Sequence, residues 1–196
     1  NESFTSTLSE PNVLPKDNLK SFTIIFNIVE SYLSQETEND TEAIKQARDI
    51  ALANDILTAA SGYKISIESA EELYNFSNAQ SFNYKYAASI NRYGYERTIK
   101  ALLSLDYILM RDIDYSTMRA RKFVPIGTNI YITVGSEIID HVYEFTGTFD
   151  GNGHTISNLY LADYSYITTT IQFDNDESTN TDISIIKHYS MFSLVG

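Results

Sequence analysis

The segment from residue 145 to residue 161, FTGTFDGNGHTISNLYL, constrains the fold more than any other part of the chain. Phe145, Gly147 and Phe149 alternate with threonines, which is the period of a half-buried strand. The run DGNG that follows predicts a tight turn, because glycine and asparagine tolerate the positive φ values that such turns require. Short strands joined by corner asparagines and glycines are typical of a coil of the parallel β-helix type. The segment therefore predicts a structural turn, formed by Gly147, Asp150, Gly151, Asn152 and Gly153.

Several segments resemble, in order along the chain, bacterial secreted and surface proteins that carry GLUG-type β-helix repeats. They are residues 63–76, 107–116, 123–128, 145–161 and 189–196. Met191 and Ser193 stand where the closing motif of that family has glycines. The resemblance covers residues 62–196 and implies the first rungs of a right-handed parallel β-helix, a solenoid.

The expected fold class is thus mainly β, with an α-helical segment before the start of a right-handed parallel β-helix. We expect a leader and helical segment over residues 1–61. A β-helix domain over residues 62–196 would begin with a capping strand and helix and carry an inserted loop and helix at 78–105. Because the last rung of a β-helix needs a cover and the chain stops at the closing motif, we expect either a fragment of a longer protein or a partner that covers this end.

The first 61 residues contain two helical patterns after a leader at 1–16 that we expect to be ordered only by docking. Residues 17–34 place apolar side chains at helical spacing, with a strand as the alternative. Residues 41–60 form the clearer helix, for which Asn39 is the expected cap. The expected inward positions are Leu19, Phe22, Phe26, Val29 and Leu33 in the first helix, and Ile44, Ala47, Ala51 and Leu57 in the second.

Charge and composition narrow the function classes. The chain has 26 acidic and 14 basic residues and a formal net charge of −12, which disfavours binding to nucleic acid or to anionic membrane surfaces. It has no cysteine, so disulfides, thiol nucleophiles and cysteine metal sites are excluded. No apolar run approaches the length of a membrane span. We expect an extracellular or cell-surface location, with the signal peptide already removed.

Carboxylates supply the weak candidates for metal binding. Asp112 and Asp114 lie two residues apart and so face the same side of a strand, while Asp174 and Asp176 belong to a polar loop. Two ligands fall short of the six to eight oxygens that calcium takes, so a structural role at a corner is the preferred interpretation. We predict no cofactor, with calcium as the alternative, and no catalytic residues.

Tyrosines supply the candidate binding surface. Tyr84, Tyr86, Tyr93 and Tyr95 lie close together in the expected insertion, and exposed tyrosines bind sugar faces and protein partners well. Core packing is the alternative for these residues. The expected partners are a carbohydrate or a host or cell-surface protein, besides further domains of the same polypeptide or a partner subunit.

The functional prediction is an extracellular structural or adhesive scaffold, either a stalk or a ligand-presenting module of a bacterial surface protein. It is not expected to be an enzyme. Two alternatives remain open at this point: a polysaccharide-degrading β-helix enzyme, a lyase or glycosidase, and an accessory module of a large secreted protease.

Overall fold

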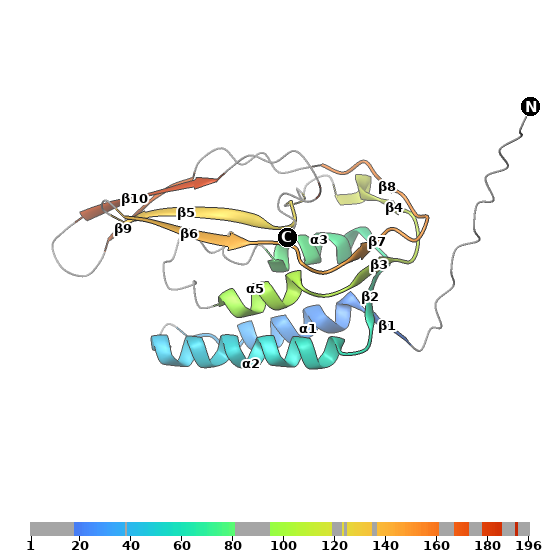
Figure 1. Cartoon of the computed structure of the whole chain (residues 1–196), viewed down its shortest axis with the longest axis horizontal. Coiled ribbons are helices and arrows are strands. Elements are labelled where there is room, and N and C mark those ends of the chain that lie inside the picture. The colour runs from blue at the N-terminus through green and yellow to red at the C-terminus, as the bar shows by residue number, and fades with distance from the viewer. Residues whose placement is uncertain are drawn as a thin grey trace, which may run out of the picture.

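A computed structural model of the chain places helices in a layer beneath short strands, with longer strands extending to one side (Figure 1). Two long helices lie side by side at the bottom of this view, and two further helices lie above them. The structure describes residues 18–37, 39–80, 95–118, 123, 125–134, 137–160, 167–172, 178–185 and 191. The expected leader at 1–16 lies outside these residues.

The first element is a strand that turns directly into a helix. Strand β1 (Leu19–Ser21) leads into helix α1 (Phe22–Leu33), and the Ser21 side chain caps this helix by accepting the backbone N–H of Thr23 at 3.1 Å. The buried face of α1 consists of Phe22, Ile25 and Val29, because its partners lie on that side alone. The predicted stripe is therefore displaced, and Phe26 and Leu33 are only partly buried at its margin.

Helix α2 (Glu42–Ala60) is capped by Thr41, whose side chain accepts the backbone N–H of Ile44 at 3.3 Å. The predicted inward face of this helix is wrong, since Ile44 and Leu57 are 47% and 45% exposed. The buried face is formed by Asp49, Leu52, Ala53, Ile56 and Ala60. It contains a carboxylate and two alanines, so hydrophobicity alone does not distinguish it from the opposite side.

The central sheet is parallel and short. Its strand order is β1-β2-β3-β7, with β2 at Lys64–Ile67, β3 at Tyr107–Leu109 and β7 at Phe149–Asp150. A second parallel pair joins β4 (Ile113–Asp114) to β8 (Ile156–Ser157). Between β4 and the next strand lies the short 3-10 helix η3 (Tyr115–Met118).

Between β2 and β3, the described residues form two helices. Helix α3 (Ala70–Gln80) packs against α1, and helix α5 (Glu96–Leu103) packs against α2 and α3. The side chains of Ile99 and Leu102 on α5 are buried in the main hydrophobic core. The expectation that residues 78–105 decorate the outside of a coil is therefore wrong for α5, which is a core element. Residues 81–94 lie outside the described residues.

The longest strands form a separate antiparallel sheet in the order β6-β5-β10-β9. Strands β5 (Thr128–Val134) and β6 (Glu137–Tyr143) pair as antiparallel neighbours. Strand β9 (Ile167–Gln172) pairs with β10 (Ser178–Ile185). Because β10 begins at Ser178, part of the polar segment 174–182, predicted as a loop, is strand.

The predicted right-handed parallel β-helix is contradicted by this arrangement. In the described residues the parallel strands are only two to four residues long, helices connect β2 to β3, and the long strands pair antiparallel. No solenoid is formed by the part of the chain that the structure describes. The local pattern of residues 145–161 specifies short strands and a turn, but strand partners are set by long-range packing, which that pattern does not contain.

One hydrophobic core joins the elements on either side of the expected boundary at residues 61 and 62. β1 pairs in parallel with β2 across that boundary. Phe22 from α1 contacts Phe76 from α3 edge-on at 5.7 Å between ring centroids, and Phe76 lies 4.2 Å from Tyr107 of β3. The helices of the first segment and the central sheet therefore stabilise each other through shared aromatic contacts.

Candidate functional site

A groove lies along α2 where that helix faces α5 and the chain after β6. Its volume is about 800 Å³. Both apolar and charged side chains line it, which is typical of sites that bind ligands of mixed character. The lining residues are Ile50, Ala53, Asn54, Leu57, Arg97, Lys100, Ala101, Ser104, Glu144 and Thr146.

The α2 wall of the groove is apolar and exposed. Ile50 is 42% exposed and Leu57 is 45% exposed, although both are large apolar side chains. They lie seven residues apart, and Asn54 lies between them, so all three fall on one side of the helix. This side borders the buried face of α2, and the apolar surface of the helix thus continues from the core into the groove.

The opposite wall is α5, whose N-terminus is held by a carboxylate from α2. Asp49 is 5% exposed and accepts the backbone N–H groups of Arg97 and Thr98 at 3.0 and 2.9 Å. It also accepts the Thr98 hydroxyl at 2.7 Å. Tyr95, at the cap position of α5, makes no side-chain capping bond. Asp49 of α2 therefore caps the N-terminus of α5. A negative charge at a helix N-terminus also interacts favourably with the helix dipole.

The C-terminus of α5 is held equally firmly by distant residues. The carbonyl oxygen of Leu103 accepts the backbone N–H groups of Thr146 and Gly147, each at 2.9 Å. The Tyr107 hydroxyl donates to the Leu102 carbonyl oxygen at 2.6 Å. Both ends of this eight-residue helix are thus satisfied by side chains or backbone from other segments. The position of α5 is therefore fixed by hydrogen bonds from other segments and does not depend on the helix propensity of its own eight residues.

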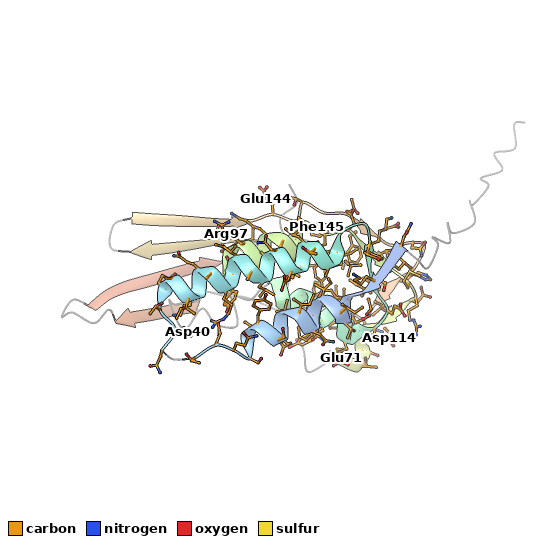
Figure 2. The ribbon with its side chains drawn as sticks, turned by 90° about the horizontal axis from the view of Figure 1, so that it is seen from below. Asp40, Glu71, Arg97, Asp114, Glu144 and Phe145 are labelled. Atoms are coloured by element: carbon orange, nitrogen blue, oxygen red, sulfur yellow. The ribbon has the colours of Figure 1, made fainter. Side chains whose placement is uncertain are left out.

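The charged groups of the groove stand on its rim. Arg97 and Glu144 are exposed and lie near one another beside α2 in Figure 2. Lys100 is also exposed and is paired with Glu96 of the same helix at 2.6 Å. The lining holds two cationic residues and one anionic residue, on a chain whose formal net charge is −12. Since Glu96 offsets Lys100, the rim carries charges of both signs.

The predicted turn at residues 150–153 is present, and its carboxylate has a local role. Asp150 accepts the backbone N–H of Asn152 at 2.9 Å and pairs with Lys64 at 3.2 Å. The first of these bonds, with help from Lys64, lowers the pKa of Asp150. Asn152 and Gly153 have φ values of 47° and 73°, so they occupy the left-handed region. Gly151 does not have a positive φ, so the turn does not require glycine at this position.

Asp112 and Asp114 face the adjacent corner and bind protein groups. Asp112 accepts the backbone N–H of Thr155 at 2.9 Å and contacts the ring nitrogen Nδ1 of His154 at 3.3 Å. The bond from Thr155, followed by that from His154, lowers the pKa of Asp112. Asp114 accepts the backbone N–H of Ser116 at 2.9 Å. These contacts support the corner role that the sequence favours for both carboxylates.

The structure does not support the predicted aromatic binding surface at its one described member. Tyr95 is 4% exposed and donates its hydroxyl to Glu36 at 2.5 Å. Burial, and then the bond to Glu36, raises the pKa of Tyr95. Tyr95 stands at the start of α5, a helix of the hydrophobic core, and is therefore buried rather than exposed at the surface. Tyr84, Tyr86 and Tyr93 lie outside the described residues.

Neither a metal centre nor a membrane helix is found in the described part of the chain. No group of three or more histidine, aspartate or glutamate side chains is arranged to hold a metal ion there. Asp174 and Asp176 lie outside the described residues. Among the helices that the structure describes, none combines the length and apolar character needed to cross a membrane.

The sequence did not predict the roles of two carboxylates, Asp49 and Glu72, that hold the starts of helices in place. Asp49 lies in an ordinary helical pattern, and nothing nearby in the sequence indicates that it caps α5. Glu72 donates its backbone N–H to the side chain of Ser69 at 3.1 Å, at the start of α3. Its carboxylate also accepts the hydroxyls of Ser21 and Thr23, each at 2.7 Å, and so joins the starts of α1 and α3.

Comparison of the chain with protein-family models, with curated proteins and with solved structures gave no match. The candidate site is therefore described by its geometry alone: a fixed pair of helices, an apolar wall on α2 and a rim with charges of both signs.

Proposed function

We propose that this chain is a binding module whose groove between α2 and α5 holds an extended polypeptide with apolar and acidic side chains. The observation that carries the proposal is the exposure of Ile50 and Leu57 along a groove of about 800 Å³. Large apolar side chains grouped on an exposed surface and rimmed by polar groups mark interaction sites.

The apolar part of the groove suits side chains rather than a flat sugar ring. Ile50 and Leu57 are aliphatic, and the floor between them is continued by Ala53 and Ala101. Among the described residues, none of the side chains that line the groove is aromatic, and aromatic faces are the surfaces on which sugars stack. Aliphatic or aromatic side chains of a polypeptide would bury the exposed apolar area of these residues and gain free energy from its removal from water.

The charged side chains of the groove favour a ligand with acidic groups. Arg97 and Lys100 are exposed on one wall, and an arginine can hold a carboxylate through two parallel hydrogen bonds. Repulsion from the rest of an acidic chain would otherwise disfavour an acidic partner, so the cationic side chains of the rim restrict such a ligand to the groove.

The wider role that we propose for the module is ligand presentation or adhesion in an extracellular protein. This part of the proposal draws on the sequence resemblance to bacterial surface proteins. The fixed helix pair supports it as well, since a preorganised groove loses little conformational freedom when a ligand binds.

The experiment is selection from a phage-displayed library of random peptides on the immobilised full chain, followed by calorimetry on the selected peptides. Leu57→Glu is expected to weaken binding at least tenfold, which corresponds to about 1.4 kcal/mol. Arg97→Glu is expected to weaken the binding of acidic peptides more than that of neutral peptides. This loss of affinity should be larger at low salt than at high salt.

Ile44→Glu is the matched control. Ile44 is as exposed as Leu57 and belongs to the same helix, but it does not line the groove. Its substitution is expected to leave the affinity of the selected peptides unchanged. Selected peptides that bind the wild-type and Leu57→Glu chains equally well would show that the groove is not the binding site.

A further inference from the structure

The groove adjoins a second, smaller hollow at the end of α2. This hollow has a volume of about 450 Å³ and lies where the chain passes from α2 into β2. Leu57 and Ser104 line both the hollow and the groove, so the two form one depression along α2. The hollow differs from the groove in its lining, which includes the aromatic side chain of Tyr63 and the carboxylate of Asp106.

Tyr63 offers the hollow an aromatic ring that is exposed and restrained. The residue is 39% exposed, and its backbone N–H donates to the Ala60 carbonyl oxygen at 3.0 Å. The Lys20 amine lies 4.2 Å from the centroid of the ring and also donates to the Ala59 carbonyl oxygen. A cation over an aromatic face is attracted to it, so Lys20 restrains the ring. A ring that is already restrained loses little freedom when it packs against a ligand.

Asp106 offers the hollow a hydrogen-bond acceptor. Its oxygen Oδ1 accepts the backbone N–H and the hydroxyl of Thr148 at 3.1 and 2.7 Å. Within the described ranges, no protein group donates to its second oxygen, Oδ2. A phenol O–H or an indole N–H that donates to a carboxylate forms a charge-assisted bond, which is stronger than a neutral one. Tyrosine and tryptophan are the side chains that combine an aromatic body with such a donor.

The length of the depression sets the spacing of the groups that a ligand presents. Arg97 lies level with Asp49 of α2, because the Asp49 carboxylate accepts its backbone N–H. The hollow lies where α2 ends, at Ala60. From Asp49 to Ala60 the helix rises about 16 Å, at roughly 1.5 Å per residue. An extended polypeptide covers that distance in about five residues, at roughly 3.3 Å per residue.

We propose that the hollow beside Tyr63 is a specificity pocket that takes a tyrosine or tryptophan side chain of the bound polypeptide. The ring of the ligand packs against Tyr63 and Leu57, and its O–H or N–H donates to Asp106. An acidic residue of the ligand, about five positions away, meets Arg97. The inference rests on the proposed function, because it names the side chain that the same polypeptide places beyond the groove.

Small aromatic probes test the pocket without any peptide. p-Cresol reproduces the tyrosine side chain, and toluene is the same ring without the hydroxyl. Each probe is titrated into the isotope-labelled full chain while the chemical shifts of the backbone amides are recorded. p-Cresol is expected to shift the amides of Gly62, Tyr63 and Asp106 and to bind several-fold more tightly than toluene. Equal affinity for the two probes, or shifts confined to other parts of the chain, would overturn the proposal.

Matched variants assign the binding of p-cresol to the two residues that carry the argument. Tyr63→Ala is expected to lower its affinity several-fold. Tyr160→Ala should leave it unchanged, since Tyr160 is 54% exposed but does not line the hollow.

Asp106→Ala is expected to abolish the preference for p-cresol over toluene, because toluene needs no acceptor. Thr148→Val is the control for this variant: it removes the hydroxyl that binds Oδ1 and leaves the carboxylate in place, so the preference should persist. A preference that survives Asp106→Ala would contradict the proposed bond.

Selected peptides separate the failure of this inference from the failure of the proposed function. Peptides that bind the full chain are expected to carry tyrosine or tryptophan about five positions from an acidic residue, and to bind Tyr63→Ala several-fold more weakly. Peptides that lose affinity with Leu57→Glu but bind Tyr63→Ala as tightly as the wild-type chain would overturn the inference and leave the peptide-binding function standing. Shifts caused by p-cresol in the hollow, without any selected peptide, would support the aromatic pocket and refute the proposed function instead.

Discussion

The surroundings of α5 and the corner at residues 150–158 use the same kinds of residue in opposite environments. At α5, Asp49 is 5% exposed and satisfies three donors of another helix. At the corner, the side chain of Asp112 is 77% exposed and its bonds to Thr155 and His154 face water. Both carboxylates accept hydrogen bonds from residues more than forty positions away. The difference in burial decides how much each bond contributes to stability.

The same contrast holds for two glycines four residues apart. Gly147 lies against α5, where an added Cβ would overlap the carbonyl oxygen of Leu105. Gly151 lies in the corner, where the nearest heavy atom to an added Cβ is 4.0 Å away. The contact at α5 thus needs glycine for close backbone approach, and the corner position tolerates a side chain.

Gly147→Ala is expected to give the largest loss of stability, about 3 kcal/mol, because a methyl group must displace backbone rather than a flexible side chain. The shift would also lengthen the bonds that the Thr146 and Gly147 N–H groups make to Leu103. Urea unfolding followed by circular dichroism measures the effect. Gly151→Ala is the matched control and should leave the midpoint almost unchanged. If the two variants were equally stable, the distinction between the two regions would fail.

Asp49→Ala is expected to cost about 2 kcal/mol, since two backbone N–H groups and a buried hydroxyl lose a charged acceptor. Amide hydrogen exchange should accelerate most at the first turn of α5. The comparison variant is Asp112→Ala, whose exposed carboxylate can be replaced by water, and which should unfold within experimental scatter of the wild-type chain. A larger effect at Asp112 than at Asp49 would reverse our ranking of the two regions.

These two regions also differ in how far sequence reasoning could predict them. The corner is local: glycine and asparagine fix the turn, so the DGNG motif predicted its position correctly. In contrast, the partners of α5 lie about fifty residues away on both sides, and no local pattern reports them. Long-range packing likewise replaced the expected solenoid with helices over short parallel strands.

The groove was missed for a related reason. The apolar spacing in α2 fits more than one side of the helix, and the pattern favoured Ile44 and Leu57 as core residues. The buried side instead contains Asp49, which a hydrophobicity argument excludes. Only the position of α5 reveals that this aspartate belongs inside and that Leu57 remains exposed.

Backbone conformation gives the corner its main contribution to stability. Asn152 has a φ of 47° and donates its side-chain amide to the Leu109 carbonyl oxygen at 3.2 Å. Asn152→Ala is expected to lower the free energy of unfolding by about 1 kcal/mol, because the left-handed conformation is less favourable for alanine than for asparagine. Asn152→Gly should recover most of that loss in a thermal melt, since glycine has no Cβ. Equal losses in both variants would place the cost in the bond to Leu109 instead.

Glu72 lies between these extremes, because it is partly buried and joins the first turns of α1 and α3. Burial alone would raise the pKa of this carboxyl. The hydrogen bonds from Ser21, from the Glu68 N–H and from Thr23 overcome burial and lower the pKa below its ordinary value of 4.5. The folded state thus favours the charged form more strongly than the unfolded state does. That stabilisation is complete above pH 4.5 and is lost as the pH falls through the folded pKa.

Glu72→Gln keeps the size of the side chain and removes its charge, so it isolates this pH-dependent part. At pH 7 the variant is expected to be less stable than the wild-type chain by about 1 kcal/mol or less, since part of the site is open to solvent. At pH 3 the gap between the two melting temperatures should narrow, because the wild-type carboxyl becomes protonated as well. A gap that stays constant from pH 7 to pH 3 would show that Glu72 contributes through packing or neutral hydrogen bonds. In that case burial alone, without charge, would account for the difference between the α5 surroundings and the corner.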